Sequence, residues 1–398
     1  MSTPAGDDER VRNWAGARRV LAVRLDALGD VLMTTPALHA AKASCPERHI
    51  TLLTSAGGAE AARLSPDVDD VIVYDAPWVK ATACRTGAGA DRQMIRRLAA
   101  GRFDAAVIFT VYSQNPLPGA MLCYLAEIPR RLAHCRENPY QLLSDWVRES
   151  EPEHGVRHEV ERQLDLVGAV GWRSDDRRMR IGVPEAAEAE VEQRLRALGL
   201  AGRSRWAVLH PGASAPSRRY PPERFAAVIR TLVSRHGWRL VLTGSAEETP
   251  LLERLRTEAP EKVVSLGGAL SLAELAALVA RAPLLISNNT GPVHVAAAVG
   301  TPVVDLYALT NPQHTPWQVP SKVLFHDVPC APCYRSVCAE HHHMCLEGVS
   351  PQQVVDAALE LARGSRRRRE PRGGSVVPLG SRLAAEGPAS PSIAEGGR

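Results

Sequence analysis

Four short turns contain side chains that could bind a phosphate or move a proton. The first is LDALGD, in which Asp30 follows a hydrophobic run and a glycine. The others are HPGASAPSRRYP, TGSAEE and SNNTGP, which supply arginines, glutamates and a glycine-containing helix start. A carboxylate can act as a general base, while guanidinium groups and free backbone amides can bind a diphosphate. A fold that brings these turns together would place a base opposite an anion site.

The turn SNNTGPVHVAAAVG is typical of a strand that ends at Asn288 and a helix that starts shortly afterwards. Gly291 permits close approach to the backbone, and Pro292 suits the first helical position. Free amides at Thr290 and Gly291, aided by the helix dipole, would bind a phosphate. The alternative is an ordinary helix start with Thr290 as its N-cap.

Charged residues in the two other C-terminal turns favour the same kind of ligand. Arg218 and Arg219 follow a glycine-containing loop, and Glu247 and Glu248 follow the next strand, where a carboxylate can accept hydrogen bonds from ribose hydroxyls. Solvated loop charges and an acidic first helical turn are the structural alternatives. The sequence has neither a G-x-G-x-x-G nor a G-x-x-x-x-G-K-[ST] motif, which argues against a dinucleotide oxidoreductase or a P-loop NTPase.

Strands and helices must position these turns, and the sequence alternates between the two patterns twice. The alternation predicts an α/β protein with two Rossmann-like domains, over residues 19–200 and 203–363. Ligand sites in such open parallel sheets lie outside the carboxyl ends of the strands, where the four turns fall. Ser271 with Glu274 three residues later predicts a capping box at one helix start.

The net charge and the composition of the two ends of the chain narrow the class of protein. We expect a flexible N-terminus over residues 1–18 and a disordered basic tail over 364–398, in which seven arginines and three glutamates account for the whole formal charge of +4. The neutral remainder, with few aromatic residues, argues against a nucleic-acid surface. Apolar runs fall short of the roughly 18–20 residues that span a bilayer, and the N-terminus lacks a secretory signal pattern, so a cytoplasmic location is expected.

The ordered set of motifs resembles glycosyltransferase family 9, the heptosyltransferase family of bacterial lipopolysaccharide core assembly. RLDALGDVLMTTPAL, LHPGAS with SRRYPPERF, LTGSAEE and SNNTGPVHVAAAVGTPVVDLY agree with it in order and spacing over about residues 19–362. The resemblance implies a GT-B fold, with the acceptor bound by the N-terminal domain and the sugar nucleotide by the C-terminal domain. It also implies an inverting transferase that needs no catalytic metal and uses an ADP-heptose donor. The acceptor would be a lipid-linked or other saccharide, with peripheral contact at the inner face of the cytoplasmic membrane.

The resemblance assigns roles to particular residues. Asp30 matches the family's proposed general base, with Asp26 as the competing carboxylate and helix capping as the structural alternative for Asp30. Arg218 falls at a phosphate-contacting position and Glu248 at a ribose-binding position, with Glu247 as a register alternative. The family motif Asp-Thr-Gly-x-x-His is matched by Thr290, Gly291 and His294. Asn289 replaces the aspartate of that motif, a contact to the donor sugar, so the exact donor stays open.

Four cysteines crowd into the segment 330–345 with the spacing C-x2-C-x4-C-x6-C. These are Cys330, Cys333, Cys338 and Cys345, with three consecutive histidines between the last two. Four thiolates, or three and an imidazole, could hold a structural zinc ion, and the thiolates could hold an iron–sulfur cluster. Free or redox-paired thiols are the alternative. A similar segment occurs in the heptosyltransferase II-like branch of the family, and catalysis needs no role for it.

Two other functions compete with glycosyl transfer. A sugar-nucleotide epimerase can share the GT-B architecture but needs no acceptor. A non-enzymatic metal- or nucleic-acid-binding protein would use the cysteine segment and the arginine tail. The oligomeric state and the acceptor are not predicted from the sequence.

Overall fold

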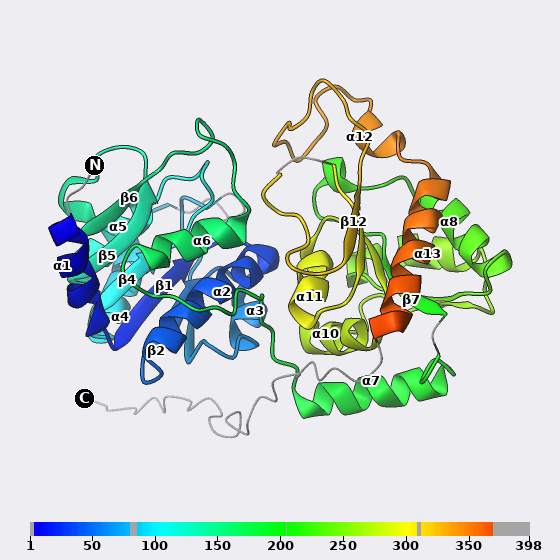
Figure 1. Cartoon of the computed structure of the whole chain (residues 1–398), viewed down its shortest axis with the longest axis horizontal. Coiled ribbons are helices and arrows are strands. Elements are labelled where there is room, and N and C mark those ends of the chain that lie inside the picture. The colour runs from blue at the N-terminus through cyan, green and yellow to red at the C-terminus, as the bar shows by residue number, and fades with distance from the viewer. Residues whose placement is uncertain (1–3, 80–85, 204, 309–311, 369–398) are drawn as a thin grey trace, which may run out of the picture.

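The computed structural model describes residues 4–79, 86–203, 205–308 and 312–368, which form two parallel six-stranded sheets covered by helices (Figure 1). Side chains alternate across the central strand of the first sheet. Val20 and Ala22 pack into one hydrophobic cluster, while Leu21 and Val23 pack into another. A strand buried on both faces is expected where helices cover both sides of a parallel sheet, which explains the continuous apolar run Val20–Val23.

The N-terminal sheet has the strand order β3-β2-β1-β4-β5-β6, and every neighbouring pair is parallel. Its strands are β1 (Arg19–Arg24), β2 (His49–Thr54), β3 (Asp70–Val73), β4 (Ala105–Ile108), β5 (Arg130–Cys135) and β6 (Asp145–Arg148). Its helices are α1 (Pro4–Ala15), α2 (Leu28–Ser44), α3 (Ala59–Arg63), α4 (Gly89–Ala100), α5 (Leu117–Leu125) and α6 (Glu159–Gly168), with a 3-10 turn η1 (Tyr140–Leu142).

The C-terminal sheet has the order β12-β11-β10-β7-β8-β9 and is also parallel throughout. Its strands are β7 (Trp206–His210), β8 (Arg239–Leu242), β9 (Val263–Ser265), β10 (Leu285–Asn288), β11 (Val303–Leu306) and β12 (Ser321–Leu324). Its helices are α8 (Pro222–Ser234), α9 (Thr249–Arg256), α10 (Leu272–Arg281), α11 (Gly291–Val299), α12 (Met344–Glu347) and α13 (Pro351–Arg368), with 3-10 turns η2 (Pro216–Arg218) and η3 (Ala246–Glu248). Two Rossmann-like sheets confirm the predicted α/β class.

Both sheets reverse their strand order at a defined point. The chain builds β1, β2 and β3 outward in one direction and then returns to place β4 on the other side of β1. The C-terminal sheet does the same between β7 and β10. Crevices outside the carboxyl ends of strands at such reversals are the usual ligand sites of open α/β sheets. The LDALGD turn follows β1, and the SNNTGP turn follows β10.

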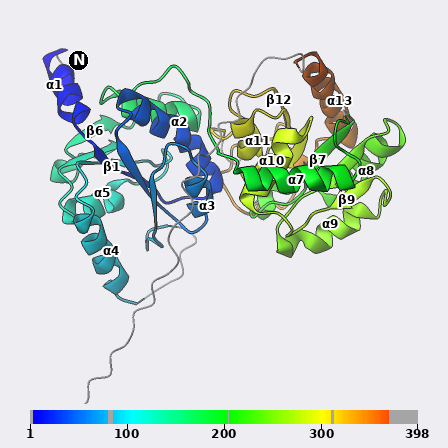
Figure 2. The same ribbon diagram turned by 90° about the horizontal axis from the view of Figure 1, so that it is seen from below.

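Three segments differ from their sequence predictions. Residues 4–15 of the predicted flexible N-terminus form helix α1, whose Trp14 is fully buried, lies against Trp172 and donates to Asp145 Oδ2 at 2.9 Å. Helix α7 (Glu185–Ala197), inside the predicted N-terminal domain, packs on α10 of the C-terminal domain (Figure 2). The predicted tail begins inside α13, which continues to Arg368, and residues 369–398 lie outside the described part of the chain.

Candidate active site at the domain interface

Arg24, the last residue of β1, binds three carboxylates. Its guanidinium is fully buried and lies 3.0 Å from Asp26 Oδ2, 3.0 Å from Asp30 Oδ1 and 2.8 Å from Glu159 Oε1. Glu159, at the start of α6, is also fully buried and accepts from Gln163 Nε2 at 2.6 Å. Three acidic groups therefore share one cation, and Asp30 is held in a fixed position beside the carboxyl end of the N-terminal sheet.

The two aspartates of the LDALGD turn have opposite electrostatic environments. Burial opposes ionisation of Asp30, but Arg24, His314 and His294 outweigh it and hold its pKa below the usual range. Burial raises the pKa of Asp26, and the neighbouring Asp30 carboxylate adds to this while Arg24 opposes it. Asp30 also accepts from the backbone amide of Ala27 at 3.3 Å, so it caps helix α2 as well. Capping and a chemical role are thus compatible for Asp30.

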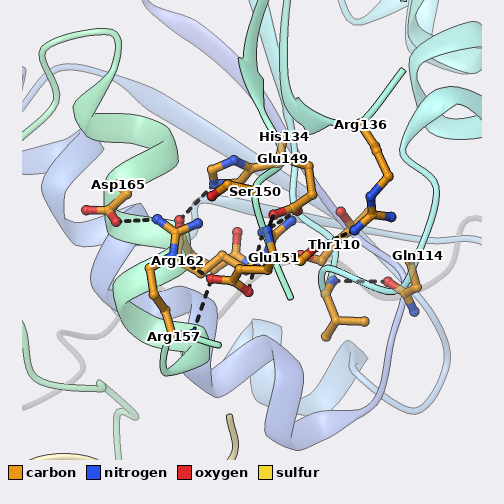
Figure 3. Close-up of polar contacts among 12 residues, drawn as sticks. Thr110, Gln114, His134, Arg136, Glu149, Ser150, Glu151, Arg157, Arg162 and Asp165 are labelled. Atoms are coloured by element: carbon orange, nitrogen blue, oxygen red, sulfur yellow. Dashed lines mark hydrogen bonds and ion pairs between the residues drawn. The ribbon is translucent and has the colours of Figure 1, made fainter. Parts of the chain in front are cut away.

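Helix α6 is anchored by a second buried charge network (Figure 3). Arg162 lies 2.5 Å from Glu149 Oε2 and donates from Nε to the carbonyl oxygen of Thr110, the second residue after β4, at 3.0 Å. Glu151 contacts both Arg162 and Arg157. Breaking a buried ion pair is costly, because it leaves an uncompensated charge in the interior. The network therefore fixes the first turn of α6, from which Glu159 reaches Arg24.

Two buried histidines of the C-terminal domain face the LDALGD turn. A Cβ atom at Gly29 would lie 2.6 Å from His294 Cδ2, so only glycine fits between the turn and helix α11. The rings of His294 and His314 are 6.3 Å apart and nearly perpendicular. Burial lowers the pKa of His294 to about 3 and that of His314 to about 4, so both imidazoles are neutral near pH 7. The domains therefore meet at Asp30, with uncharged donors or acceptors opposite it.

The start of α11 has the form predicted for an anion site. The helix begins at Gly291 with Thr290 as its N-cap, and within the described residues no side chain caps it. Pro292 has no amide hydrogen and Val293 N donates to the carbonyl oxygen of Thr290 at 3.0 Å, so the phosphate-binding interpretation rests on the amides of Thr290 and Gly291. A Cβ at Gly291 would lie 3.0 Å from Leu28 of the N-terminal domain, so the helix start also lies at the domain interface.

Asn289 is bound within its own domain. Its side-chain amide donates to Asp305 Oδ2 and to the carbonyl oxygen of His314, both at 2.9 Å, and the residue is 2% exposed. Asp305 is fully buried, which raises its pKa to about 7, and its Oδ1 has no hydrogen-bond partner within the described residues. An aspartate at position 289 would face Asp305 across a hydrogen-bond distance. The asparagine at position 289 avoids this repulsion, because its amide donates a hydrogen bond to the Asp305 carboxylate on the neighbouring strand β11.

The two arginines after β7 have different environments. Arg219 donates from Nε to the carbonyl oxygen of Ala213 at 2.8 Å and so braces its own loop. Arg218 lies near His294 and His314, and its buried Nε has no hydrogen-bond partner in the described part of the chain. Arg218 as a whole is half-buried, and a guanidinium with free hydrogen-bonding capacity suits a phosphate ligand. The geometry thus favours Arg218, the residue predicted, over Arg219.

Glu248 lies against the loop that follows β7. Its carboxylate accepts from the backbone amide of Ser245 at 2.9 Å in a capping box, and a Cβ at Gly212 would overlap it. Burial lowers the pKa of His210, at the end of β7, to about 4 against the opposing effect of Glu248. Two turns of the C-terminal sheet therefore meet at Glu248, whereas Glu247 is fully exposed on the same 3-10 turn.

The four clustered cysteines line one cavity of about 290 Å³, together with His342 and His343. All four are free and partly exposed. Within the residues that the structure describes, no three His, Cys, Asp or Glu side chains are arranged to hold a metal ion. The predicted zinc or iron–sulfur site is therefore not supported, because the thiols share a cavity without converging on one point.

The cysteine segment nevertheless contacts the site. Ser217 Oγ donates to the carbonyl oxygen of Arg335 at 2.6 Å, and its amide donates to that of Ser336 at 3.1 Å, next to Arg218. Tyr334 stacks edge-on against Tyr112 of the N-terminal domain. The segment therefore supports the arginine loop and touches the opposite domain.

The structure brings most of the predicted site residues to one interface. Asp30, Arg218, Thr290, Gly291 and His294 lie around it, with Asn289 just beneath, and Glu248 lies beside the next turn of the same sheet edge. Sequence reasoning missed Arg24, Glu159, His314 and Asp305. Glu159 lies 135 residues from Arg24 in the chain, so no local pattern could have paired them. Arg24, directly after four apolar strand residues, is the one signal that the sequence offered.

Comparisons with known proteins agree with this geometry. The family model described as "Glycosyltransferase family 9 (heptosyltransferase)" matches residues 92–344. A lipooligosaccharide heptosyltransferase 2 of Haemophilus influenzae is 29% identical over 54% of this chain and 63% of its own length. A lipopolysaccharide heptosyltransferase 2 of Escherichia coli is 25% identical over 85% of this chain and 97% of its own length. The chain thus matches less than two thirds of the first of these relatives and nearly all of the second.

Solved structures share the fold. ADP-heptose lipopolysaccharide heptosyltransferase II of Escherichia coli superposes with a TM-score of 0.68 at 20% identity, covering 87% of this chain and 99% of that one. An Escherichia coli heptosyltransferase with ADP-2-deoxy-2-fluoro heptose gives 0.63 at 19% identity, covering 86% and 99%. At such low identity the likeness establishes the GT-B arrangement of two Rossmann-like domains.

Proposed function

Because the chain belongs to glycosyltransferase family 9, we propose that it transfers a heptose from an ADP-sugar to a saccharide of the lipopolysaccharide core type. One observation carries the proposal. The Asp30 carboxylate of one domain faces His294 and His314 of the other, next to the uncapped start of α11, and Arg218 lies near the same two histidines. A proton acceptor thus lies opposite a set of anion-binding groups, which is the arrangement that glycosyl transfer with inversion requires.

The reaction would proceed in one displacement. An acceptor hydroxyl oxygen forms a bond to the anomeric carbon while the bond from that carbon to the diphosphate oxygen breaks, and the bonding electrons leave with ADP. Arg218 and the amides of Thr290 and Gly291 would stabilise the negative charge on the leaving group. Asp30 would accept the hydroxyl proton. With its lowered pKa it is ionised at neutral pH and would take the proton as the attacking oxygen becomes acidic.

The donor that we propose is an ADP-heptose. A relative bearing ADP-2-deoxy-2-fluoro heptose supports an ADP-heptose. Glu248 would bind the ribose hydroxyls, as acidic residues do at this edge of nucleotide-binding sheets. Its carboxylate packs against Gly212 in the loop after β7, where a Cβ atom would overlap it. Asn289 would contact the sugar through its side-chain oxygen, because its amide hydrogens are used by Asp305 and His314.

Two measurements test the proposal. ADP-heptose is expected to raise the melting temperature more than UDP- and GDP-sugars do, because a ligand bound to the native state stabilises it. Asp30→Ala should lower kcat by about 100- to 10,000-fold and leave the dissociation constant of ADP within about twofold. The assays contain EDTA, since the proposed charge stabilisation comes from Arg218 and backbone amides.

Asp70→Ala is the matched control, because this aspartate is largely exposed on the far strand β3. Unchanged turnover in Asp30→Ala would remove Asp30 as the base. Incubation with donor alone separates the epimerase alternative, since an epimerase would change the sugar without an acceptor. Absence of a thermal shift with every nucleotide sugar would contradict the transferase itself.

We also propose that the protein makes peripheral contact with the inner face of the cytoplasmic membrane. Among the described helices, none combines the length and the apolarity that a membrane crossing requires. Helix α5 exposes Met121, Tyr124 and Leu125. A lipid-linked acceptor lies at a membrane surface, and these apolar side chains would favour peripheral contact with it.

A further inference from the structure

The cysteine segment 330–345 has no task in the proposed reaction, yet it contacts the turn that carries Arg218. Its four cysteines and Ser217 line the same cavity of about 290 Å³. Ser217 is the middle residue of the 3-10 turn η2, which ends at Arg218. A change in the way the cysteine segment binds Ser217 would therefore move the turn from which the Arg218 side chain extends.

Residues 334–337 make the contacts to this turn, and they follow directly after Cys333. Ser217 donates from Oγ to the carbonyl oxygen of Arg335 at 2.6 Å and from its amide to that of Ser336 at 3.1 Å. All four residues of the loop are exposed, so burial does little to fix their position. The loop therefore depends on where the chain is held at Cys333.

Cys330 and Cys333 form a C-x-x-C pair, which is typical of thiols that exchange with disulfides. Both are free and partly exposed. His342 Nε2 lies 4.0 Å from Cys330 Sγ. The Met344 amide donates to His342 Nδ1 at 3.0 Å, which places the proton of the neutral ring on Nε2, facing the sulfur. An N–H directed at the sulfur favours the thiolate, the form that attacks a disulfide.

We propose that Cys330 and Cys333 are a redox-sensitive thiol pair whose oxidation to a disulfide weakens phosphate binding at Arg218. The inference rests on the proposed function, because it takes Arg218 as the phosphate ligand. The structure, in which both thiols are free, is the reduced form. A disulfide holds the two Cβ atoms about 3.5–4.5 Å apart, a constraint that free thiols do not impose on the residue that precedes the loop.

The oxidant is a low-molecular-weight disulfide. The Cys330 thiolate forms a bond to one of its sulfurs while the S–S bond breaks, and the bonding electrons leave with the other sulfur as a thiolate. The Cys333 thiolate then attacks the Cys330 sulfur and displaces the second small thiolate. The protons of the two protein thiols go to the released thiolates. Two protein thiols are thus oxidised while one small disulfide is reduced to two thiols.

The new constraint would disturb two sets of contacts. The carbonyl oxygens of the loop 334–337 would shift away from Ser217, so the turn η2 would lose support next to Arg218. Tyr334, directly after Cys333, lies edge-on to Tyr112 of the N-terminal domain with the ring centroids 6.3 Å apart, and this contact would shift as well. Oxidation would therefore loosen the phosphate ligand and one contact between the domains together.

The test compares reduced and oxidised full-length protein, with oxidised glutathione as the oxidant and ADP as the probe. Oxidation of the wild type should remove two hydrogens from its mass and raise the dissociation constant of ADP about fivefold or more, and dithiothreitol should reverse both effects. Cys330→Ser should abolish both. Cys338→Ser is the matched control, because Cys338 is a free, partly exposed thiol of the same cavity, and this variant should respond as the wild type does.

Ser217→Ala tests the connection to Arg218 without any oxidation. The variant loses the hydrogen bond from Oγ to Arg335 but keeps the one from the amide. The dissociation constant of ADP for the reduced variant should therefore rise about two- to fivefold. Wild-type affinity in this variant would contradict the proposed connection.

Three results with the wild type would overturn the thiol switch. These are a disulfide-containing protein that binds ADP as tightly as the reduced one, no disulfide at excess oxidised glutathione, and stoichiometric zinc or iron held by the four thiols. If the reduced wild type did not bind ADP, the proposed function would fail instead, so the two failures are distinguishable.

Discussion

At the residue scale, the charged side chains at the domain interface share partners. Arg24 alone neutralises part of the charge of Asp26, Asp30 and Glu159. Because Asp26 and Asp30 compete for one guanidinium, their ionisation is linked, and Asp30, which faces the opposite domain, keeps the lowered pKa. The sequence shows each of these residues but not the competition, which depends on distances across the fold.

Asp305 gives a prediction about pH and stability. Burial raises its pKa to about 7, well above the usual value near 4, so the folded state keeps a proton that the unfolded chain releases. The free energy of unfolding should therefore fall as the pH rises from about 4 to about 7. Asp305→Asn removes this dependence, and Asn289 can still donate to the new amide oxygen. We expect the variant to gain about 2–4 kcal/mol over the wild type between pH 4 and pH 8.

Denaturant unfolding at several pH values checks this expectation. Only the difference between variant and wild type is compared, since the other titrating groups are common to both. A difference that stays constant from pH 4 to pH 8 would show that Asp305 does not titrate in this window.

At the element scale, local patterns were predictable and distant packing was not. The capping box of α10 is confirmed, with the Ser271 amide donating to Glu274 Oε2 at 2.8 Å, because both partners lie within four residues. The alternation of strands and helices is likewise visible in the sequence. The packing of helix α7 could not be predicted in this way. Its apolar face includes Val191 and Leu195, but only the fold shows that this face covers α10.

The same contrast applies to the candidate site. The turns after β1, β7, β8 and β10 were identified because parallel strands bring their carboxyl ends to one edge. His314 was missed, because it lies in a segment without regular structure, and its burial depends on contacts with the opposite domain.

Gly212→Ala tests the turn that holds Glu248. The backbone of Gly212 is not in the left-handed region, so the added methyl group acts only through its overlap with the Glu248 carboxylate. We expect Glu248 to move and the dissociation constant of ADP to rise at least tenfold, with a loss of about 1 kcal/mol from the disturbed capping box. Titration calorimetry and thermal unfolding measure the two effects. Gly89→Ala is the control, because a Cβ there meets nothing within 4 Å. Unchanged ADP affinity in Gly212→Ala would argue against Glu248 as a nucleotide ligand.

At the scale of the whole molecule, a segment of the C-terminal domain holds the two domains together. The Glu159 amide donates to the carbonyl oxygen of Gln313 at 3.2 Å, and His158 Nε2 lies 2.9 Å from the carbonyl oxygen of Thr315. Trp317 donates to the carbonyl oxygen of Arg177 at 2.7 Å. These contacts join the start of α6, which positions Arg24 through Glu159, to the segment that contains His314. Closure of the domains and placement of Asp30 are therefore physically connected.

Trp317→Ala tests this connection. The substitution removes the hydrogen bond to Arg177 and the stacking on His158, whose ring lies 4.5 Å from that of Trp317. The domains should then separate more often in solution, which would increase the radius of gyration and lower kcat at least tenfold. The affinity for ADP should change less than twofold, because the proposed nucleotide ligands all belong to the C-terminal domain. Trp317→Phe keeps the ring without the donor and should fall between the two. Small-angle scattering and steady-state kinetics measure both effects, and wild-type values for both would show that the interface stays closed without this contact.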